Sequence, residues 1–358
     1  MNKNQLFYYM ILLTGLLLWS CTDDDNPAEE TPGKGKALLI LNEGSMNGNN
    51  ATLARYDLQE EVMDRTYFNS VNDKGLGDVA NDMLQYGTKI YIAVNMSGTI
   101  EVLESATGRS IRQIAMKTTG GQSKEPRRLA AYGGKVYVTS FDDTVTRIDT
   151  LSLTIDGSVT VGMDPEGIAI RNNWIYVANS GGLNWENGYD NTLSVIDLAS
   201  FTEEKKITVG TNPNTVQVDS QGDIYLSVTG NYGDEPAAFK VIRSGSSTAE
   251  TISGIEAPQK FVISDNKAYI ISGAYQQPYK LVVYDCLEEE IIADSFISDG
   301  TEIAIIYNVS VDPLTGDLFL TSTDYVNPGD LYWFDKSGKL KKRLSAVGIN
   351  PSVVLVQN

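Results

Sequence analysis

From residue 37 onward, one short pattern recurs: an apolar residue, an aromatic or apolar residue and another apolar residue, flanked by turns rich in Gly, Asn or Asp. A ring stands at the centre of each of six copies, and successive rings are 46, 39, 49, 44 and 50 positions apart. A period of 40 to 50 residues is typical of β-propeller blades rather than of helical repeats. A weaker seventh copy is ALLILN at 37–42. The six rings are Tyr91, Tyr137, Tyr176, Tyr225, Tyr269 and Phe319.

Each copy belongs to a larger unit. An apolar segment precedes it, often introduced by proline as in EPRRLAAY from Glu125, and an alternating segment follows it and usually ends in an acid. A fourth segment, such as KKITVG from Lys205, completes the unit. Period-two alternation between turn residues predicts four antiparallel strands per unit. The acids that end the third strand are expected to cap turns; they are Asp57, Glu104, Asp149, Asp197, Asp285 and Asp335, and Arg243 breaks the rule.

The two ends of the repeat region complete one unit. ALLILN reads as a second strand without a first, and NPSVVLVQ from Asn350 reads as a first strand without a second. Pairing them closes a ring and covers two sheet edges that would otherwise be exposed. The 322 residues of 37–358 divided by seven give 46, which matches the observed period. The sequence therefore predicts an all-β fold, a seven-bladed β-propeller closed by its N- and C-terminal strands.

The first 36 residues are predicted to be a targeting signal followed by a flexible tether. Lys3 is the only charge before an apolar run from Met10 to Leu18, which is too short to span a membrane. With Cys21 shortly after it, residues 1–20 resemble a bacterial lipoprotein signal, which implies cleavage before Cys21 and acylation of its thiol. An ordinary secretory signal cut elsewhere is the alternative. Residues 21–36 are polar and acidic, and predict a flexible tether.

The acidic run Asp23 to Asp25 in this tether resembles the export tag of surface-displayed lipoproteins of gut anaerobes, although a solvated spacer is the alternative. We expect an outer-membrane protein, lipid-anchored and exposed at the cell surface. Cys286 has no disulfide partner if Cys21 is acylated, and we expect it to be a small buried hydrophobic residue.

The amino-acid composition argues against several classes of catalytic site and partner. Histidine is absent, which removes imidazole-based catalysis and zinc sites that use imidazole. The 28 Lys and Arg against 46 Asp and Glu give a net charge of -18, so nucleic acid is not an expected partner. The densest basic cluster, KKR at 341–343, is expected on an outer strand. We predict no cofactor and no metal ion, and a binding protein rather than an enzyme.

A binding surface is predicted on one face of the ring, where the loops between second and third strands emerge. In the third unit the interval from Tyr137 to Asp149 is 12 residues, whereas from Tyr176 to Asp197 in the fourth it is 21. The nine additional residues lie in 180–191 and carry Trp185 and Tyr189, which are costly to expose to water.

Neighbouring loops offer similar chemistry, because rigid rings with a polar handle alternate with neutral amides. This set suits a large, uncharged, amphipathic ligand; a corrinoid fits, and a sugar stacked on aromatics fits nearly as well. About half of these rings are expected to pack between loops. The predicted ligand-binding residues are Asn95, Phe141, Asn179, Trp185, Tyr189, Tyr232, Tyr275 and Tyr325.

The whole region resembles the YncE-like seven-bladed propellers. The stretches LNEGSMNGNNATLARYD at 41–57, LGDVANDML at 76–84 and VGINPSVVLV at 347–356 resemble the surface-lipoprotein branch of that family, which contains the BtuG-type vitamin B12 capture proteins. The resemblance implies binding of a corrinoid at the cell surface and transfer to a TonB-dependent outer-membrane transporter.

Two other functions stay open. One is a glycan-binding or other surface-binding module. The other is a calcium-dependent lactonase-like hydrolase with oxygen ligands at the axis, for which Glu43, Asn95, Asn179 and Asn308 are the candidates. No aligned set of acids recurs on the innermost strands. DSQGD at 219–223 and DPLTGD at 312–317 resemble calcium loops, but they fall where hairpins between first and second strands are needed, and we interpret them as turns.

Overall fold

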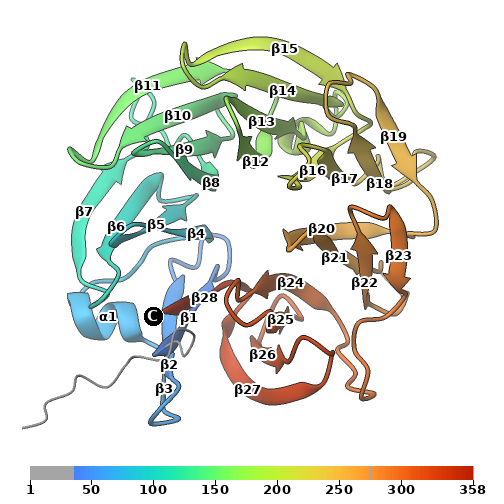
Figure 1. Cartoon of the computed structure of the whole chain (residues 1–358). Helices are drawn as coiled ribbons and strands as arrows, with labels where there is room; N and C mark the ends of the chain where they lie inside the picture. The colour runs from blue at the N-terminus through green and yellow to red at the C-terminus, as the bar shows by residue number, and fades with distance from the viewer. Residues whose placement is uncertain (1–35, 275, 358) are drawn as a thin grey trace, which may run out of the picture. The chain divides into compact units, whose positions relative to one another are not determined.

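The computed structural model describes residues 36–274 and 276–357, and within this part of the chain it contains seven four-stranded antiparallel sheets arranged in a ring (Figure 1). This confirms the predicted β-propeller. One strand of each sheet lies closest to the axis of the ring. From blade 1 to blade 7 these inner strands are β28 (Pro351–Gln357), β4 (Ala80–Tyr86), β8 (Pro126–Tyr132), β12 (Pro165–Arg171), β16 (Pro213–Val218), β20 (Pro258–Ser264) and β24 (Ile306–Val311).

The second strands carry the repeated rings at their centres, as the sequence predicts. Tyr91 and Tyr225 are fully buried, and Tyr176 is half-buried. In blade order the second strands are β1 (Ala37–Asn42), β5 (Lys89–Val94), β9 (Lys135–Ser140), β13 (Trp174–Asn179), β17 (Ile224–Val228), β21 (Lys267–Ser272) and β25 (Leu318–Ser322).

The third and outermost strands complete each sheet. The third strands are β2 (Thr52–Asp57), β6 (Thr99–Glu104), β10 (Thr144–Asp149), β14 (Thr192–Asp197), β18 (Ala238–Ile242), β22 (Lys280–Asp285) and β26 (Pro328–Phe334). The outermost strands are β3 (Met63–Asp64), β7 (Ser110–Ala115), β11 (Thr154–Thr160), β15 (Thr202–Thr208), β19 (Ala249–Ile252), β23 (Glu290–Ala293) and β27 (Leu340–Ile349).

Blade 1 joins the two ends of the repeat region, as predicted. Strand β28 pairs with β1 from Ala37 opposite Gln357 to Asn42 opposite Pro351. The backbone N–H of Glu43 continues this pairing by donating to the carbonyl oxygen of Asn350 at 3.0 Å. The ring is therefore closed by hydrogen bonds between segments more than 300 residues apart in the chain.

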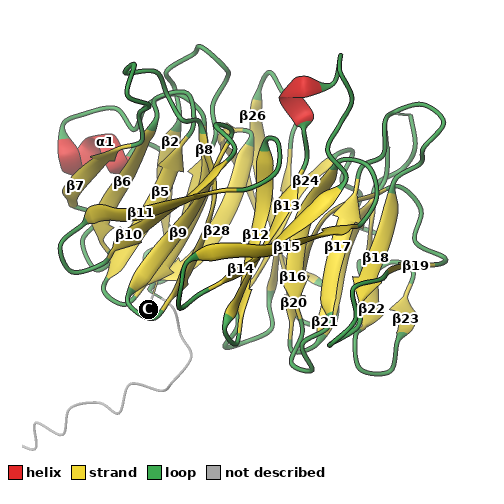
Figure 2. Ribbon diagram, turned by 90° about the horizontal axis from the view of Figure 1, so that it is seen from above, coloured by secondary structure: helices red, strands yellow, loops and turns green. Residues whose placement is uncertain are grey.

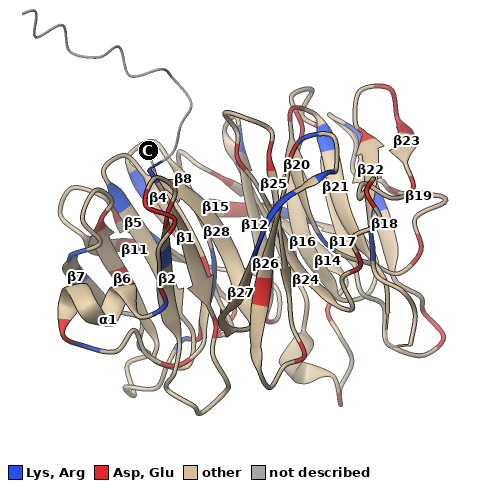
Figure 3. Cartoon of the chain, turned by 90° about the horizontal axis from the view of Figure 1, so that it is seen from below, with Lys and Arg blue, Asp and Glu red and all other residues tan. Residues whose placement is uncertain are grey.

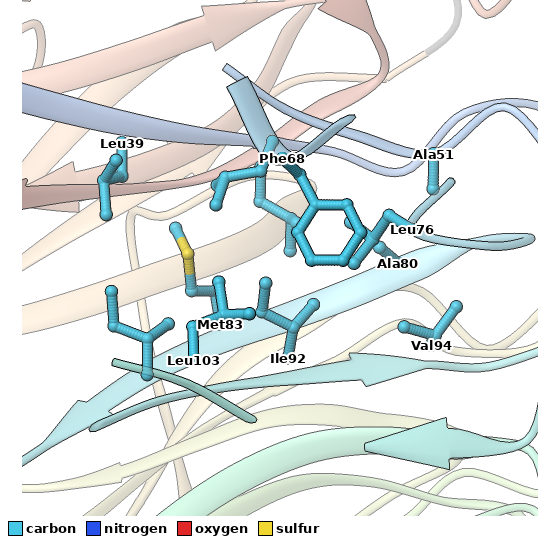
Figure 4. Packing of buried hydrophobic residues seen from close by; sticks show 12 residues of the cluster. Leu39, Ala51, Phe68, Leu76, Ala80, Met83, Ile92, Val94 and Leu103 are labelled. Atoms are coloured by element: carbon cyan, nitrogen blue, oxygen red, sulfur yellow. The ribbon is translucent and has the colours of Figure 1, made fainter. Parts of the chain in front are cut away.

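The hydrophobic core lies between neighbouring sheets. Between blades 1 and 2, Leu39 on β1 packs with Met83 on β4 and Ile92 on β5 (Figure 4). Strand β3 has only two residues, and the short helix α1 (Tyr67–Asn72) follows it and inserts fully buried Phe68 into this core. Burial of such side chains is the main source of stability in a fold without long helices.

The turns follow the predicted chemistry. At the end of β10, Oδ1 of Asp149 accepts hydrogen bonds from the N–H groups of Leu151 and Ser152. Asp57, Asp197, Asp285 and Asp335 accept equivalent bonds from backbone N–H groups of their own turns. The two loops that resemble calcium sites are turns between first and second strands, organised by Asp219 and Asp312.

Two further sequence predictions are confirmed. Cys286 is 1% exposed, as expected for a small buried hydrophobic residue, and burial raises the pKa of its thiol to about 12. The basic run at 341–343 lies on β27, the outermost strand of blade 7, and its members form ion pairs with Asp317, Glu61 and Asp330. Acidic and basic residues are scattered over the blades (Figure 3). None of the helices described is long and apolar enough to cross a membrane.

Candidate functional site

Every inner strand begins with an irregularity that turns extra side chains toward the axis. In all seven described sheets, the register between the inner and second strands shifts at the start of the inner strand. In blade 3, Pro126 pairs with Ser140 and Leu129 pairs with Val138, so Arg127 and Arg128 together face one residue of β9. This is a β-bulge, which breaks the alternation of the strand and redirects side chains.

The residue before each inner strand links the bulge, through a backbone hydrogen bond, to the loop that follows the second strand. In six blades this residue is not glycine and has a positive φ, between 41° and 58°. In all seven, its carbonyl oxygen accepts a hydrogen bond from the first residue after the second strand, as Glu125 does from Phe141 at 3.1 Å. We call the face on which these loops emerge the rim face; the short helix η1 (Gly182–Asn184) projects from it at the top of Figure 2.

At the rim-face end of the axis, the bulges gather charged and aromatic side chains from several blades. Asn81 and Asp82 come from blade 2, Arg127 and Arg128 from blade 3, and Glu166 from blade 4. Lys260 comes from blade 6 and Tyr307 from blade 7, while Glu43 follows β1 in blade 1. These eight residues are called the axial mouth below.

Arg127 and Glu166 form the strongest contact of the axial mouth. The Nε and Nη2 atoms of Arg127 donate to Oε1 of Glu166 at 3.0 and 2.5 Å, and Nη1 donates to the amide oxygen of Asn81 at 2.6 Å. Burial alone raises the pKa of Glu166, but the positive charges of Arg127 and Arg128 outweigh burial and hold the pKa below its usual value. The pair is therefore ionised, with Glu166 only 6% exposed.

Arg128 and Asp82 lie beside this pair. Nη1 of Arg128 donates to the carbonyl oxygen of Asn81 at 2.6 Å, and its Nε lies 3.8 Å from the second oxygen of Glu166. The carboxylate of Asp82 accepts the backbone N–H groups of Leu129 at 2.8 Å and Met83 at 3.0 Å. Burial raises the pKa of Asp82 in spite of these bonds and of nearby Arg128.

Lys260 occupies the other side of the axis. Its Nζ lies 4.2 Å from the centre of the Tyr307 ring, a cation–π contact. Burial, with repulsion from Arg128 and Arg127, lowers the pKa of Lys260 to about 8, although Glu43 and Glu166 oppose the shift. The hydroxyl of Tyr307 donates to Oε2 of Glu43 at 2.8 Å, and burial together with Glu43 raises the pKa of that hydroxyl well above its usual value.

Aromatic side chains stand above the axial mouth on the rim-face loops. Tyr325 packs edge-on against Tyr307, with ring centres 6.0 Å apart. Tyr232 packs edge-on against Tyr189 at 6.4 Å. Trp185 ends helix η1 and is 61% exposed, Tyr232 is 80% exposed and Tyr325 is 58% exposed. Large exposed rings gathered on one face are typical of a surface that binds a ligand or a partner.

The structure brings several predicted site residues together. Phe141 lies under the guanidinium of Arg127, with 4.5 Å between the charge centre and the ring centre. Tyr325 contacts the axial mouth through Tyr307, and Tyr189 and Tyr232 form a pair. Trp185 follows η1 directly and belongs to neither of these pairs. These positions agree with a binding role, which stays a prediction.

The predicted Asn residues have supporting positions instead. Asn179 is fully buried, and its Nδ2 donates to the hydroxyls of Thr192 and Ser194 at 2.9 Å each. Asn95 is 4% exposed, with Nδ2 3.4 Å from the carbonyl oxygen of Pro126. Both amides stabilise the rim loops in this structure, and a direct ligand contact stays untested for them. Tyr275 lies outside the described residues.

Of the eight residues of the axial mouth, sequence analysis places only Glu43 at the axis and misses the other seven. It predicts segments such as EPRRLAAY and APQKFVIS only as first strands, whereas the two residues after each proline lie in the bulge at the start of the inner strand. Alignment of the seven inner-strand segments at their first residues, which are prolines in five of them, shows charged residues at those positions in several blades.

One concave surface lies away from this site. A pocket of about 480 Å³ lies between blades 4 and 5 and is lined by Arg171, Trp174 and Tyr176, among others. We place the candidate site at the axial mouth because charged and exposed aromatic side chains from several blades converge there. The described residues contain no group of three or more His, Cys, Asp or Glu arranged to hold a metal ion.

Comparisons with known proteins identify the fold and nothing finer. No family model matches the chain, and no curated protein matches it. Among solved structures, hydrazine synthase from Kuenenia stuttgartiensis is similar with a TM-score of 0.60 and 14% identity, over 74% of this chain and 85% of that one. The computationally designed Ika8 protein is similar with a TM-score of 0.56 and 13% identity, over 90% of both chains. At these identities the likeness concerns the propeller fold alone.

Proposed function

We propose that this chain is a cell-surface lipoprotein that captures a large amphipathic ligand, a corrinoid such as vitamin B12, and hands it to an outer-membrane transporter. One observation supports this most: exposed Trp185, Tyr232 and Tyr325 stand on the same face as a polar, charged axial mouth. A flat macrocycle with a polar fringe can lie against the rings while its polar groups reach the charged residues. Binding, not catalysis, is the proposed activity.

Calorimetric titration of cyanocobalamin into the mature protein tests the ligand. We expect a dissociation constant in the micromolar range or tighter, because a capture protein must hold a scarce ligand; ~1 µM corresponds to about -8 kcal/mol. Absence of binding at roughly 10 µM protein would exclude the corrinoid role.

Replacing Trp185 by Ala should weaken cyanocobalamin binding by about fivefold or more, since loss of an aromatic anchor costs ~1 kcal/mol or above. The matched control is Tyr132→Ala. Tyr132 is also an exposed ring, but it ends β8 at the opposite end of the strand from Arg127. If both variants bind as the unchanged protein does, Trp185 lies outside the site.

A glycan-binding module is the second candidate. The high exposure of Tyr232 and Trp185 favours it, since open aromatic platforms stack sugar rings. A titration panel of oligosaccharides alongside cyanocobalamin separates the two functions. Calcium found by elemental analysis in protein purified without chelator, and lost after chelation together with esterase activity, would instead support a hydrolase.

Cys21 and the preceding residues 1–20 carry the anchor in this proposal, and they lie outside the described residues. The variant Cys21→Ala should leave the membrane fraction and appear in the soluble fraction, because acyl chains supply the membrane affinity. Fractionation of cells and immunoblotting measures this, with Cys286→Ala as the control that keeps the anchor. Unchanged membrane association of Cys21→Ala would contradict lipidation.

A further inference from the structure

Hydrogen-bonding capacity at the axial mouth is unevenly used. Glu166 accepts from Arg127 through Oε1, while its buried Oε2 has no hydrogen-bond partner among the described residues; Asp82 accepts two backbone N–H groups, and Glu43 accepts the Tyr307 hydroxyl. Arg127 is fully engaged by Glu166 and Asn81, but the other two cations, Lys260 and Arg128, keep unused donors. Lys260 makes no hydrogen bond or ion pair with any residue in the described part of the chain, and an ammonium offers three donors. Arg128 uses Nη1 for the carbonyl of Asn81 and has further N–H groups beside it.

The fold holds these cations on opposite sides of the axis. Arg128 lies on β8 of blade 3 and Lys260 on β20 of blade 6, which stand across the ring from each other (Figure 1). Each sits in the bulge that opens its inner strand, so its backbone is fixed by sheet pairing rather than by a mobile loop. Repulsion between them is part of the cause of the lowered pKa of Lys260.

We propose that the axial mouth binds an oxyanion, a carboxylate or a phosphate group, between Lys260 and Arg128. The inference deepens the proposed function, on which it rests, because it adds that the captured ligand carries an anionic group that reaches the axis while its apolar surface lies on the rim rings. An oxyanion uses the idle donors of both cations and removes their mutual repulsion.

Proton uptake should accompany this binding. The groups that face Lys260 are Arg127, Arg128, Glu43, Glu166 and Tyr307. The pKa of Arg128 is raised above its usual value, the pKa of Glu166 is lowered below its usual value, and the pKa of the Tyr307 hydroxyl is raised well above its usual value. Lys260, with a pKa of about 8, is therefore the group that changes charge in mildly alkaline solution. The ammonium form binds the anion, so affinity should be highest below pH 8 and fall as pH rises above it, by up to about tenfold per pH unit.

Trace acetylation of the intact protein at pH 8 tests the site without any substitution. The reaction rate of each lysine is followed by peptide mass spectrometry in sodium phosphate, in sodium acetate, and in sodium chloride of the same ionic strength. We expect at least one of the two oxyanions to slow acetylation of Lys260 about fivefold or more by binding and protonating it. The oxyanion that slows acetylation of Lys260 more shows whether the site prefers a phosphate or a carboxylate group.

Lys336, in the exposed turn between β26 and β27, is the control for general salt effects. Equal rates at Lys260 in all three salts, or equal protection of Lys336, would overturn the proposal.

Two variants of Lys260 complete the test. Lys260→Met should weaken binding of the oxyanion that protects Lys260 from acetylation, inorganic phosphate or acetate, by about tenfold or more. Lys260→Arg should retain binding and lose its dependence on pH between 7 and 9.5, because an arginine does not titrate there. Circular dichroism confirms that each variant is folded.

The same variants separate this inference from the corrinoid proposal. Protection of Lys260 together with no binding of cyanocobalamin would refute the proposed ligand and retain the oxyanion site. Equal cyanocobalamin affinity in unchanged protein and Lys260→Met, with no protection of Lys260, would refute the oxyanion site and retain capture.

Discussion

Burial of Lys260 at the axial mouth costs stability at neutral pH. Lys260 is partly buried, next to two guanidinium groups, and its contact with the Tyr307 ring does not compensate. A cation whose native pKa lies below its value in the unfolded chain is held at a cost whenever it is protonated. Such costs concentrate at functional sites, where the group is needed for something other than folding.

Lys260→Met should therefore be more stable than the unchanged protein at pH 7, by on the order of 1 kcal/mol after allowance for solvent screening. The unfolded chain binds more protons at this position between pH 8 and about 10.5, so the stability of the unchanged protein rises across that window. The advantage of the variant should shrink there. Urea unfolding at pH 7 and pH 10 measures both values. A less stable variant at pH 7 would mean that the ammonium is well accommodated in the mouth.

Inner strands are packed so closely that some positions admit no side chain. At Gly167, the second bulge residue of β12, an added Cβ would lie 2.5 Å from the carbonyl oxygen of Asn214 on β16 and 2.9 Å from the backbone nitrogen of Val216. Both contacts are with backbone, which cannot move without shifting a whole strand. The adjacent residue in β12 is Glu166, so this spacing also fixes the ion pair with Arg127.

Gly167→Ala should lower stability by about 1–3 kcal/mol, the usual cost of overpacking. Gly120→Ala is the matched control, because its Cβ would meet only one side-chain atom, at 3.7 Å, and its backbone does not need glycine. Thermal unfolding followed by circular dichroism compares the two. Equal melting temperatures would show that blades 4 and 5 can separate at little cost.

At the scale of the whole molecule, closure of the ring depends on one seven-residue strand, β28. Strand β28 is the inner strand of blade 1 and pairs with β1 over its whole length. It also carries Val353 and Leu355 into the core between blades 1 and 2. A ring without it would expose a long apolar sheet edge, which favours association with other chains.

Deletion of residues 350–358 should therefore abolish the monomeric folded state or shift it toward aggregates. Deletion of Asn358 alone, beyond the end of β28, is the control and should change nothing. Size-exclusion chromatography and amide exchange at β1 (Ala37–Asn42) detect the effect. A monomeric truncated protein with unchanged protection of β1 would show that blade 1 is stable with three strands.

The sequence was sufficient for the fold because each blade repeats the same local rules. Rings such as Tyr91 recur at a fixed period, proline and turn acids mark strand boundaries, and the incomplete first and last units require each other. The axial mouth follows no local rule. Arg128 and Lys260 are 132 positions apart in the sequence and face the same axis only because the blades close into a ring. The bulges also break the alternation on which a sequence prediction of facing relies.

The seven bulges have an evolutionary implication. Each inserts one or two residues ahead of the regularly paired apolar residues of the inner strand, such as Arg127 and Arg128 before Leu129. Under the proposed binding role, substitution at these positions would change ligand recognition and leave the paired apolar residues of each blade in place. A propeller of this kind can acquire a new specificity stepwise, through changes in separate blades.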